Sequence, residues 1–467
     1  MDIFVMNNPS VLAHSLCAVA VISAPMAMAH NSESPPRIAV SHSITRLIEQ
    51  AITHDATRKQ FAAQSQAVRE TGIASATLMD PKVKIGVGGL PTDSFKFDDD
   101  PMTNISLGVM QQFERGDTLD LQQKKANQQA DSITLQSAAR ELDIANAMSQ
   151  LWLELGYQQT AQQILRENQR LLRELENVIQ TNYAIGTSEA QDLLQAQLQV
   201  SQLDEKLNAN QQMQQRIIAQ LSEWLGSKWL DNNPSNPKPN LQATNQLDWI
   251  KLDGLIDTER DQTQHYRLLA QHPMVKMADI AIATNHTQVE IAEQAYQPQF
   301  GVEVMYAYRQ ANNMRGEPAS DLVSAYLTMD IPLFTGNRQD RTHAATQYQL
   351  GATQQQKDRL LAQMNANVNR LLVDRSNLTQ RLERYSLTLL PQVEARIDAV
   401  ERGYQNNTAQ FNDVISASRE ALNLQLEQAR LVTDLNIVNS NLAALLSAFD
   451  YQVTPATYSI HDTQPTN

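Results

Sequence analysis

Two carboxylates occupy matching positions in a stretch of sequence that occurs twice. The first copy runs from Asn182 to Ala196 and contains Asp192, and the second runs from Gly403 to Ala417 and contains Asp413, an offset of 413 − 192 = 221 residues. Carboxylates repeated in this way could attract cations. Each would also fall in the first turn of a predicted helix, where it would stabilise the positive end of the helix dipole. Both roles are compatible with the sequence.

The other residues that could do chemistry form no catalytic or metal-binding pattern. His265 and His272 are seven positions apart and could share a helix face, but the sequence offers no third ligand, so we expect two surface histidines. The methionines are scattered, which is typical of core filling rather than of a copper site. The sequence has no Gly-rich phosphate loop, His-Glu-x-x-His or nucleophile-elbow motif, so we expect neither an enzyme nor a cofactor.

The two carboxylates belong to a longer internal repeat. The same offset relates Tyr183 to Tyr404 and Leu225 to Leu446, so that about forty residues align without a gap. Such a repeat indicates that one structural unit was built twice and that the two copies pack side by side.

Each unit is predicted to contain a helix, two strands, a long helix, a turn and a second helix. Apolar residues at helical spacing predict the helices, and strict alternation predicts the strands. Pro391 should kink or unwind the helix in which it lies. In chain order the predicted elements are helix 43–78, strands 81–90 and 104–113, helices 119–182, 188–225 and 273–296, strands 298–309 and 321–334, a helix from the junction at 336–339 to 402, and a helical run that opens within 403–417 and ends at 446.

The organisation along the chain follows from this repeat. We predict a signal peptide at 1–29, a first repeat at 30–226, a Pro- and Asn-rich connection at 227–261, a second repeat at 262–450 and a C-terminal tail at 451–467.

Cysteine content and charge exclude two classes of function, thiol chemistry in the mature chain and nucleic-acid binding. An apolar run and the small residues Ala27 and Ala29 predict secretion, the alternative being a disordered apolar tail. The only cysteine, Cys17, lies in the part that would be removed, so the mature chain would have no thiol chemistry. Removal of Asp2 leaves 51 − 1 = 50 acidic residues against 37 basic ones, a net charge of −13. With no basic cluster, nucleic acid is not an expected partner.

The strands could reach a membrane only as part of a larger assembly. No apolar run beyond the signal peptide reaches the length of about eighteen residues that a membrane-spanning helix needs. Four strands cannot close a barrel, because an open sheet edge is not tolerated in lipid. Two chains would give eight strands filled by side chains, and three would give twelve, which is wide enough for a passage. The alternative is a solvated periplasmic coiled coil that transports nothing.

The strand-to-helix junctions and the two Tyr-containing turns resemble the TolC family of outer-membrane efflux ducts, over residues 40–450. The features are Gln297-Pro-Gln-Phe-Gly-Val-Glu-Val304, Ile331-Pro-Leu-Phe-Thr-Gly-Asn-Arg-Gln339 and the turns, in the same order in both units. The resemblance implies a mainly α fold with a small β part. It would form a homotrimer with an α-helical tunnel across the periplasm and a 12-stranded transmembrane β-barrel in outer-membrane lipid, four strands per chain.

The same resemblance implies partners and a substrate class. Family members are passive ducts that dock with a periplasmic adaptor protein and an inner-membrane RND-type pump. The runs Asp80–Pro91 and Phe113–Thr118 resemble the branch that exports heavy-metal cations more than the drug or protein-export branches. Export of drugs or of secreted protein through the same duct is the alternative.

The resemblance also implies a functional site at the two turns. They would form the periplasmic tip, where the tunnel closes and the adaptor docks, through Tyr183, Gly186, Thr187, Tyr404, Asn407 and Thr408. Asp413 falls where the family has a gate aspartate, and Asp192 is its counterpart. In a trimer each would form a ring of carboxylates facing the axis, and crowding would raise their apparent pKa values.

The tip departs from the pattern of TolC itself. Ala409 and Ser416 replace a gate arginine and a second aspartate, so any lock must use other contacts. The sequence also gives the turn residues local roles. Thr187 and Thr408 are expected to be helix N-caps, and Gly186 and Asn407 can adopt the left-handed turn conformation.

Overall fold

A computed structural model describes residues 37–226, 241–258, 263, 265–406 and 408–457, with side chains from Ile44 onward. The chain divides into two units, Met1–Arg37 and Ile38–Asn467, and the architecture below is that of the second unit. The predicted signal peptide at 1–29 lies outside the described residues, as do parts of the predicted connection and tail.

Helices account for most of this unit, and the strands form one small sheet, as the sequence predicts. The elements in order are α1 (Arg37–His54), α2 (Ala56–Ser75), β1 (Lys82–Gly88), β2 (Asn104–Gln112), α3 (Thr118–Ala184), α4 (Ala190–Leu225), α5 (Ile250–Thr258), α6 (Tyr266–Leu269), α7 (Pro273–Gln294), β3 (Gln299–Tyr308), β4 (Leu322–Asp330), α8 (Gln339–Arg384), the π-helical turn η2 (Tyr385–Leu389), α9 (Leu390–Gln405) and α10 (Phe411–Leu445).

The sheet joins the two repeats. Its strands are antiparallel and lie in the order β1-β2-β3-β4. The hairpin of the first repeat pairs with that of the second through β2 and β3, in a register that runs from Ile105 opposite Tyr308 to Gln112 opposite Gly301. The outer strands β1 and β4 each have one edge that is unpaired within the described residues.

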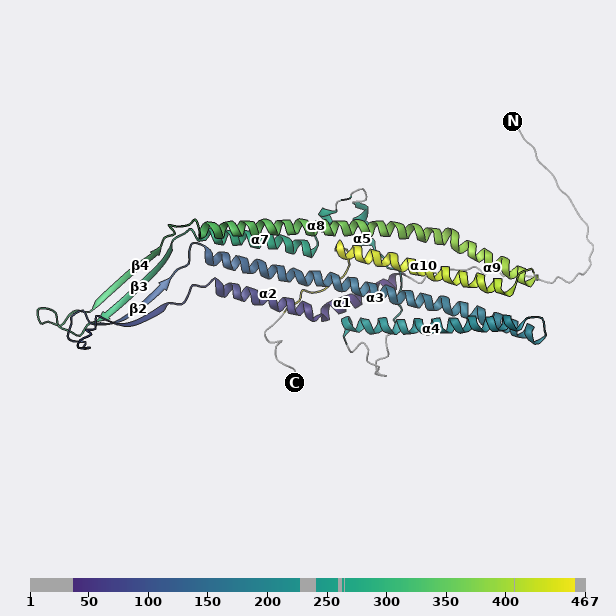
Figure 1. Ribbon diagram of the computed structural model, residues 1–467, viewed down its shortest axis with the longest axis horizontal. Helices are drawn as coiled ribbons and strands as arrows, with labels where there is room; N and C mark the ends of the chain where they lie inside the picture. The colour runs from purple at the N-terminus through teal and green to yellow at the C-terminus, as the bar shows by residue number, and fades with distance from the viewer. Residues whose placement is uncertain (1–36, 227–240, 259–262, 264, 407, 458–467) are drawn as a thin grey trace, which may run out of the picture. The chain divides into compact units, whose positions relative to one another are not determined.

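The long helix α3 connects most of the helical part. It spans 67 residues and packs against α2, α4, α7 and α10. Figure 1 shows the sheet at one end of this unit and the turns that follow α3 and α9 at the other. The two repeats therefore lie side by side along α3. None of the described helices is both long enough and apolar enough to cross a membrane.

Two apolar clusters hold the middle of the helical part together. One lies among α1, α3 and α4 and includes Trp152, which is 1% exposed. The other lies among α5 to α8 and α10 and includes Leu442 and Val275. Phe449, just after α10, packs against both clusters. Because each large side chain that is fully buried contributes about 1.5–3 kcal/mol, each cluster holds its own set of helices together, and Phe449 links the two clusters.

The predicted single helix at 43–78 is wrong, because the structure breaks it at Asp55. The Asp55 carboxylate accepts a hydrogen bond from the Arg58 amide at 2.8 Å and caps α2. Arg140 from α3 holds the same carboxylate at 3.2 Å. An aspartate bonded in this way favours a new helix start over a continuous helix.

Two further boundaries differ from the prediction or refine it. The fourth strand ends at Asp330 rather than at 334, because its partner β3 begins at Gln299 and Pro332 has no amide to donate. The predicted irregularity near Pro391 is confirmed, since η2 immediately precedes it. A proline clashes with the carbonyl four residues earlier, which here is that of Leu387 within η2.

Candidate functional site

The turns that follow α3 and α9 share one hydrogen-bond pattern. In the first, the backbone N and Oγ1 of Thr187 donate to the Asn182 carbonyl at 2.8 and 3.0 Å. In the second, the same two groups of Thr408 donate to the Gly403 carbonyl at 2.8 and 3.1 Å. Each threonine therefore closes the end of the preceding helix.

The predicted N-cap role of these two threonines is wrong. The N-cap of α4 is Glu189 and that of α10 is Gln410, each two residues beyond the threonine. The threonine hydroxyls are already bonded to the carbonyl behind them. The chain then needs one extended residue to start the next helix, and Glu189 and Gln410 supply it with ψ angles of 152° and 156°.

The first turn exposes apolar side chains. Gly186 has a φ of +80°, the left-handed conformation predicted for it. Tyr183 is 46% exposed and Ile185 is 70% exposed. The corresponding glycine position of the second turn is Asn407, which lies outside the described residues.

The second turn is packed instead. The ring of Tyr404 is half-buried and lies 6.3 Å from that of Phe411, at an interplanar angle of 58°. Both rings join an apolar cluster that draws on both repeats; its buried members are Ile179, Ala196, Phe411 and Ile415. Tyr183 and Tyr404 are thus equivalent in sequence but not in environment, because only Tyr183 is free to contact another molecule.

Asp192 and Asp413 both occupy the third position of their helices, α4 and α10. The Asp413 carboxylate accepts a hydrogen bond from the backbone N–H of Gln410 at 3.0 Å. The Gln410 side chain accepts one from the backbone N–H of Asp413, which completes a capping box. Among the described residues, α4 has no capping box at its start, so the Asp192 carboxylate lacks this role. The repeat therefore provides one carboxylate held by a cap and one that is not.

An amide pair that the sequence interpretation missed links the two helix starts. Nε2 of Gln195 on α4 donates to Oδ1 of Asn412 on α10 at 2.8 Å. Gln195 lies three residues after Asp192, and Asn412 directly precedes Asp413. The signal available in the sequence was the position of both amides, each within one helical turn of a repeated aspartate.

Charged groups further along α9 and α10 pair with each other. Arg396 on α9 forms an ion pair with Glu420 on α10. The hydroxyl of Tyr385 in η2 donates to Glu427 at 2.6 Å, and this hydrogen bond raises the pKa of the tyrosine. This hydrogen bond therefore holds the π-helical turn η2 against α10.

At the other end, the sheet has one apolar and one polar face. Residues directly opposite each other in paired strands lie on the same face, so the register assigns every strand residue. The first face carries no charge and is exposed; with Gln111 at its end it consists of Val83, Ile85, Val87, Ile105, Leu107, Val109, Phe300, Val302, Val304, Tyr306, Tyr308, Val323, Ala325, Leu327 and Met329. The opposite face carries mainly small, polar and charged residues, together with Met110, Met305, Leu322 and Tyr326.

Comparison with known proteins identifies this architecture. No family model and no curated protein matches the chain. Solved structures do match: the outer-membrane protein VceC of Vibrio cholerae at a TM-score of 0.67 and 15% identity, over 87% of this chain and 96% of that one. The outer-membrane channel OprN matches at 0.67 and 14%, over 87% and 90%, and CusC at 0.67 and 14%, over 87% and 92%. The chain has the TolC-like outer-membrane channel fold.

Within this channel fold, the two predicted surface histidines are in fact buried. His265 is 4% exposed and His272 is 7% exposed, so that prediction is wrong. Burial lowers the pKa of His272 to about 4. Across the part of the chain that the structure describes, no three His, Asp or Glu side chains are arranged to hold a metal ion.

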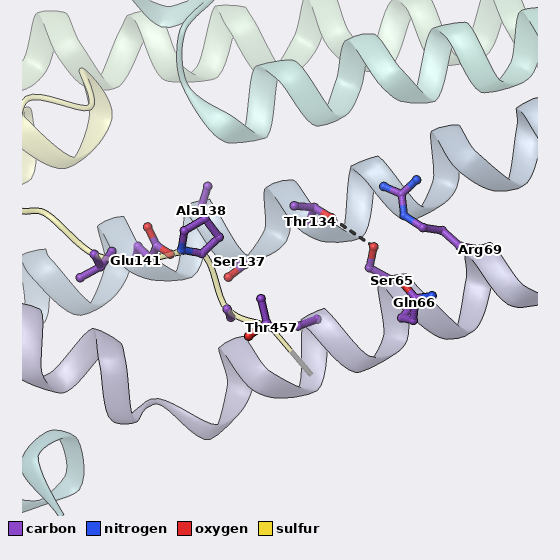
Figure 2. A pocket seen from close by; sticks show the side chains of 12 residues that line it. Ser65, Gln66, Arg69, Thr134, Ser137, Ala138, Glu141 and Thr457 are labelled. Carbon is purple, nitrogen blue, oxygen red and sulfur yellow. Dashed lines mark hydrogen bonds between the residues drawn. The ribbon is translucent and has the colours of Figure 1, made fainter. Parts of the chain in front are cut away.

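A cavity of about 440 Å³ lies where the C-terminal segment crosses α2 and α3 (Figure 2). Several of the polar side chains that line it have partners within the chain. Ser65 bonds to Thr134 at 3.1 Å, Arg69 pairs with Asp131 at 2.5 Å, and Glu141, whose pKa burial raises, pairs with Arg58 at 2.6 Å. These hydrogen bonds and ion pairs beside the cavity therefore join α2 to α3.

Proposed function

We propose that three copies of this chain form an exit duct in the outer membrane, with a 12-stranded barrel and an α-helical tunnel that crosses the periplasm. The observation that carries this proposal is the sheet, which combines an uncharged apolar face with two open edges.

The apolar face needs a non-aqueous partner. Ile85 is 78% exposed and Val323 73% at the two ends of one row, and Leu327 is 72% exposed on another row of the same face. Contiguous apolar patches of this kind mark contact with a membrane or another protein. Because the face spans all four strands, lipid is the partner that fits it, and the polar face would line a water-filled passage.

The open edges need further strands. In lipid, the unpaired backbone groups of β1 and β4 would each cost several kcal/mol, which only closure of the sheet removes. β4 of one copy pairing with β1 of the next would supply it. Three copies give twelve strands, a barrel wide enough for a passage.

Cysteine cross-linking tests this closure directly. With Cys17 inside the predicted signal peptide, the mature chain would be free of cysteine. A panel that combines Val83→Cys or Ile85→Cys on β1 with Val323→Cys or Leu327→Cys on β4 should give oxidised trimers in outer-membrane fractions. As a matched control, Leu107→Cys with Tyr306→Cys, which face each other within one chain, should cross-link without any increase in mass.

The alternative is a periplasmic coiled-coil protein that transports nothing. It would leave the apolar sheet face in water, so the duct fits the described surface better. A monomer recovered only from the periplasm, with no intermolecular cross-link in any β1–β4 pair, would favour the alternative and reject the duct.

The tip would be the gate, opened when an adaptor and an inner-membrane RND-type pump engage it. Rings of Asp192 and Asp413 would favour cations there. Asp413→Asn removes the charge but keeps an oxygen that can accept the hydrogen bond from the backbone N–H of Gln410. Asp413→Ala removes both the charge and the acceptor. If charge gates the tip, conductance in a planar bilayer should change equally in the two variants; if the cap alone matters, only alanine should change it.

Adaptor docking is assigned to the exposed surface of the turns. Tyr183 and Ile185 present apolar area there, with Gly186 and Thr187 fixing the turn and Thr408 the second one. Tyr404 would support the surface from inside. Tyr183→Ala should weaken adaptor binding while leaving the trimer intact, and unchanged adaptor co-purification would argue against this surface.

Heavy-metal cations are the proposed cargo. The support is the sequence resemblance of Asp80–Pro91 and Phe113–Thr118 to that branch, together with the repeated carboxylates. Deletion of the gene should lower tolerance of metal salts more than tolerance of drugs. The opposite ranking would assign the same duct to drug export.

A further inference from the structure

The polar face of the sheet has a defined row structure. One row holds Lys82, Met110, Glu303 and Tyr326, and the neighbouring row toward the loops holds Lys84, Gly108, Met305 and Ser324. Beyond that row, toward the loops, the face continues with the uncharged residues Gly86, Ser106, Ala307 and Leu322. The charged side chains are therefore gathered on the half of the sheet that is nearer the helices.

Most of these charges cancel in pairs. Lys84 reaches across β2, where Gly108 has no side chain, and its Nζ lies 2.6 Å from the Glu303 carboxylate. Asp330, at the end of β4, pairs with Arg115 from the segment after β2. Glu303 is only 16% exposed in this pair, so its carboxylate is already occupied.

Lys82 is left over. It shares a row with Glu303, but Met110 stands between them on β2. Among the described residues, no ion pair involves Lys82, and its side chain is exposed. Lys82 is thus the one charged strand residue of this face without an ion pair among the described residues, two residues along β1 from the neutral pair of Lys84 and Glu303.

We infer that Lys82 sets the ion preference of the barrel section of the duct, as a ring of three ammonium groups that favours small anions. This inference rests on the proposed function, since only closure of the barrel brings three copies of the polar face around one passage. Rings of Lys or Arg favour anions in pores just as rings of Asp or Glu favour cations. The barrel would then oppose in sign the carboxylate rings proposed at the tip.

The size of the effect follows from screened electrostatics. Three unit charges about 10 Å from the axis, in water and screened over about one Debye length, change the ratio of cation to anion permeability about fivefold. Neutralising Lys82 should remove that factor. Reversing its charge should change the permeability ratio by the same factor a second time, for a total of about 25-fold relative to the parent.

The test is the reversal potential of the purified protein in a planar bilayer under a potassium chloride gradient. Because the tip rings would dominate a closed duct, all variants carry Asp192→Ala and Asp413→Ala. Lys82→Gln and Lys82→Glu should shift selectivity stepwise toward cations. The matched control, Lys84→Gln combined with Glu303→Gln, alters two residues of the same face without changing its net charge and should leave selectivity unchanged.

Two negative results have different meanings. A well-folded parent protein that inserts but never conducts would overturn the duct and this inference with it. Channels that conduct, but whose selectivity is the same in the parent and in Lys82→Glu, would overturn the role of Lys82 and leave the duct standing.

Discussion

Replacing His272 by asparagine should remove a pH dependence from the stability of this protein. His272 is the N-cap of α7, where its Nδ1 accepts a hydrogen bond from the Met274 amide at 3.2 Å. A protonated imidazole has no acceptor, so the cap requires the neutral ring. Burial lowers the pKa of His272 to about 4, although its hydrogen bond to the Ala444 backbone opposes the shift.

The sign and the size of the effect follow from linkage. The unfolded chain takes up the proton at about pH 6.5 and the folded chain only at about pH 4, so stability is full above the first value and falls toward the second. The difference between these two pKa values corresponds to about 3 kcal/mol of unfolding free energy in total, of which roughly 1 kcal/mol is lost by pH 5.5.

In His272→Asn the amide oxygen still caps α7, but the bond to Ala444 is lost, which costs about 1 kcal/mol at every pH. The variant should be the less stable protein at pH 8. Its stability curve should cross that of the parent between about pH 5 and pH 6.

Urea unfolding followed by circular dichroism from pH 8 to pH 4.5, at constant ionic strength, measures this crossing. The difference between parent and variant cancels the contributions of other titrating groups. His54→Asn, which changes an exposed histidine on α1, should follow the parent throughout. Parallel curves for the parent and His272→Asn would refute the reasoning.

Three further substitutions test other contacts. Ser447 has a φ of +53° and a buried Oγ without a partner among the described residues, whereas its repeat counterpart Gly226 has a φ of +85°. Ser447→Gly should therefore raise the unfolding free energy by about 1 kcal/mol in urea, and a loss would contradict the strain. Phe411→Ala should cost about 3–4 kcal/mol and speed amide exchange in both turns; protection lost in one turn only would mean that they are not joined. Asp413→Ala should cost about 1 kcal/mol and speed exchange in the first turn of α10, whereas Asp413→Asn should not.

The strands could be predicted because a period of two assigns each side chain to a face. Val83, Ile85 and Val87 alternate with Lys82 and Lys84, and the structure places the first set on the apolar face. Such a pattern needs no knowledge of distant residues, since the pleat alone decides it. The order of the strands, with β2 against β3, was not in the pattern, because it depends on how the two repeats pack.

The errors concern residues whose role is decided by which of several possible contacts they make, near or distant in sequence. Asp55 is compatible with a helix interior until Arg140 from α3 holds it as a cap. A threonine after a helix can close that helix or start the next, and the position of the Asn182 carbonyl decides this for Thr187. His272 reads as a surface residue until α10 covers it.

The candidate site shows why an internal repeat should not be interpreted as two equivalent functional copies. Asp413 is held by a capping box, and the turn before it is packed through Tyr404 on Phe411. The first copy has no such cap, and it exposes Tyr183 and Ile185. A carboxylate fixed by a cap has a defined position and therefore suits a gate ring, whereas an exposed apolar turn suits a surface that binds a partner. Duplication explains why both turns have one backbone geometry, and the divergence of a few side chains would then divide the proposed gating and docking roles between them.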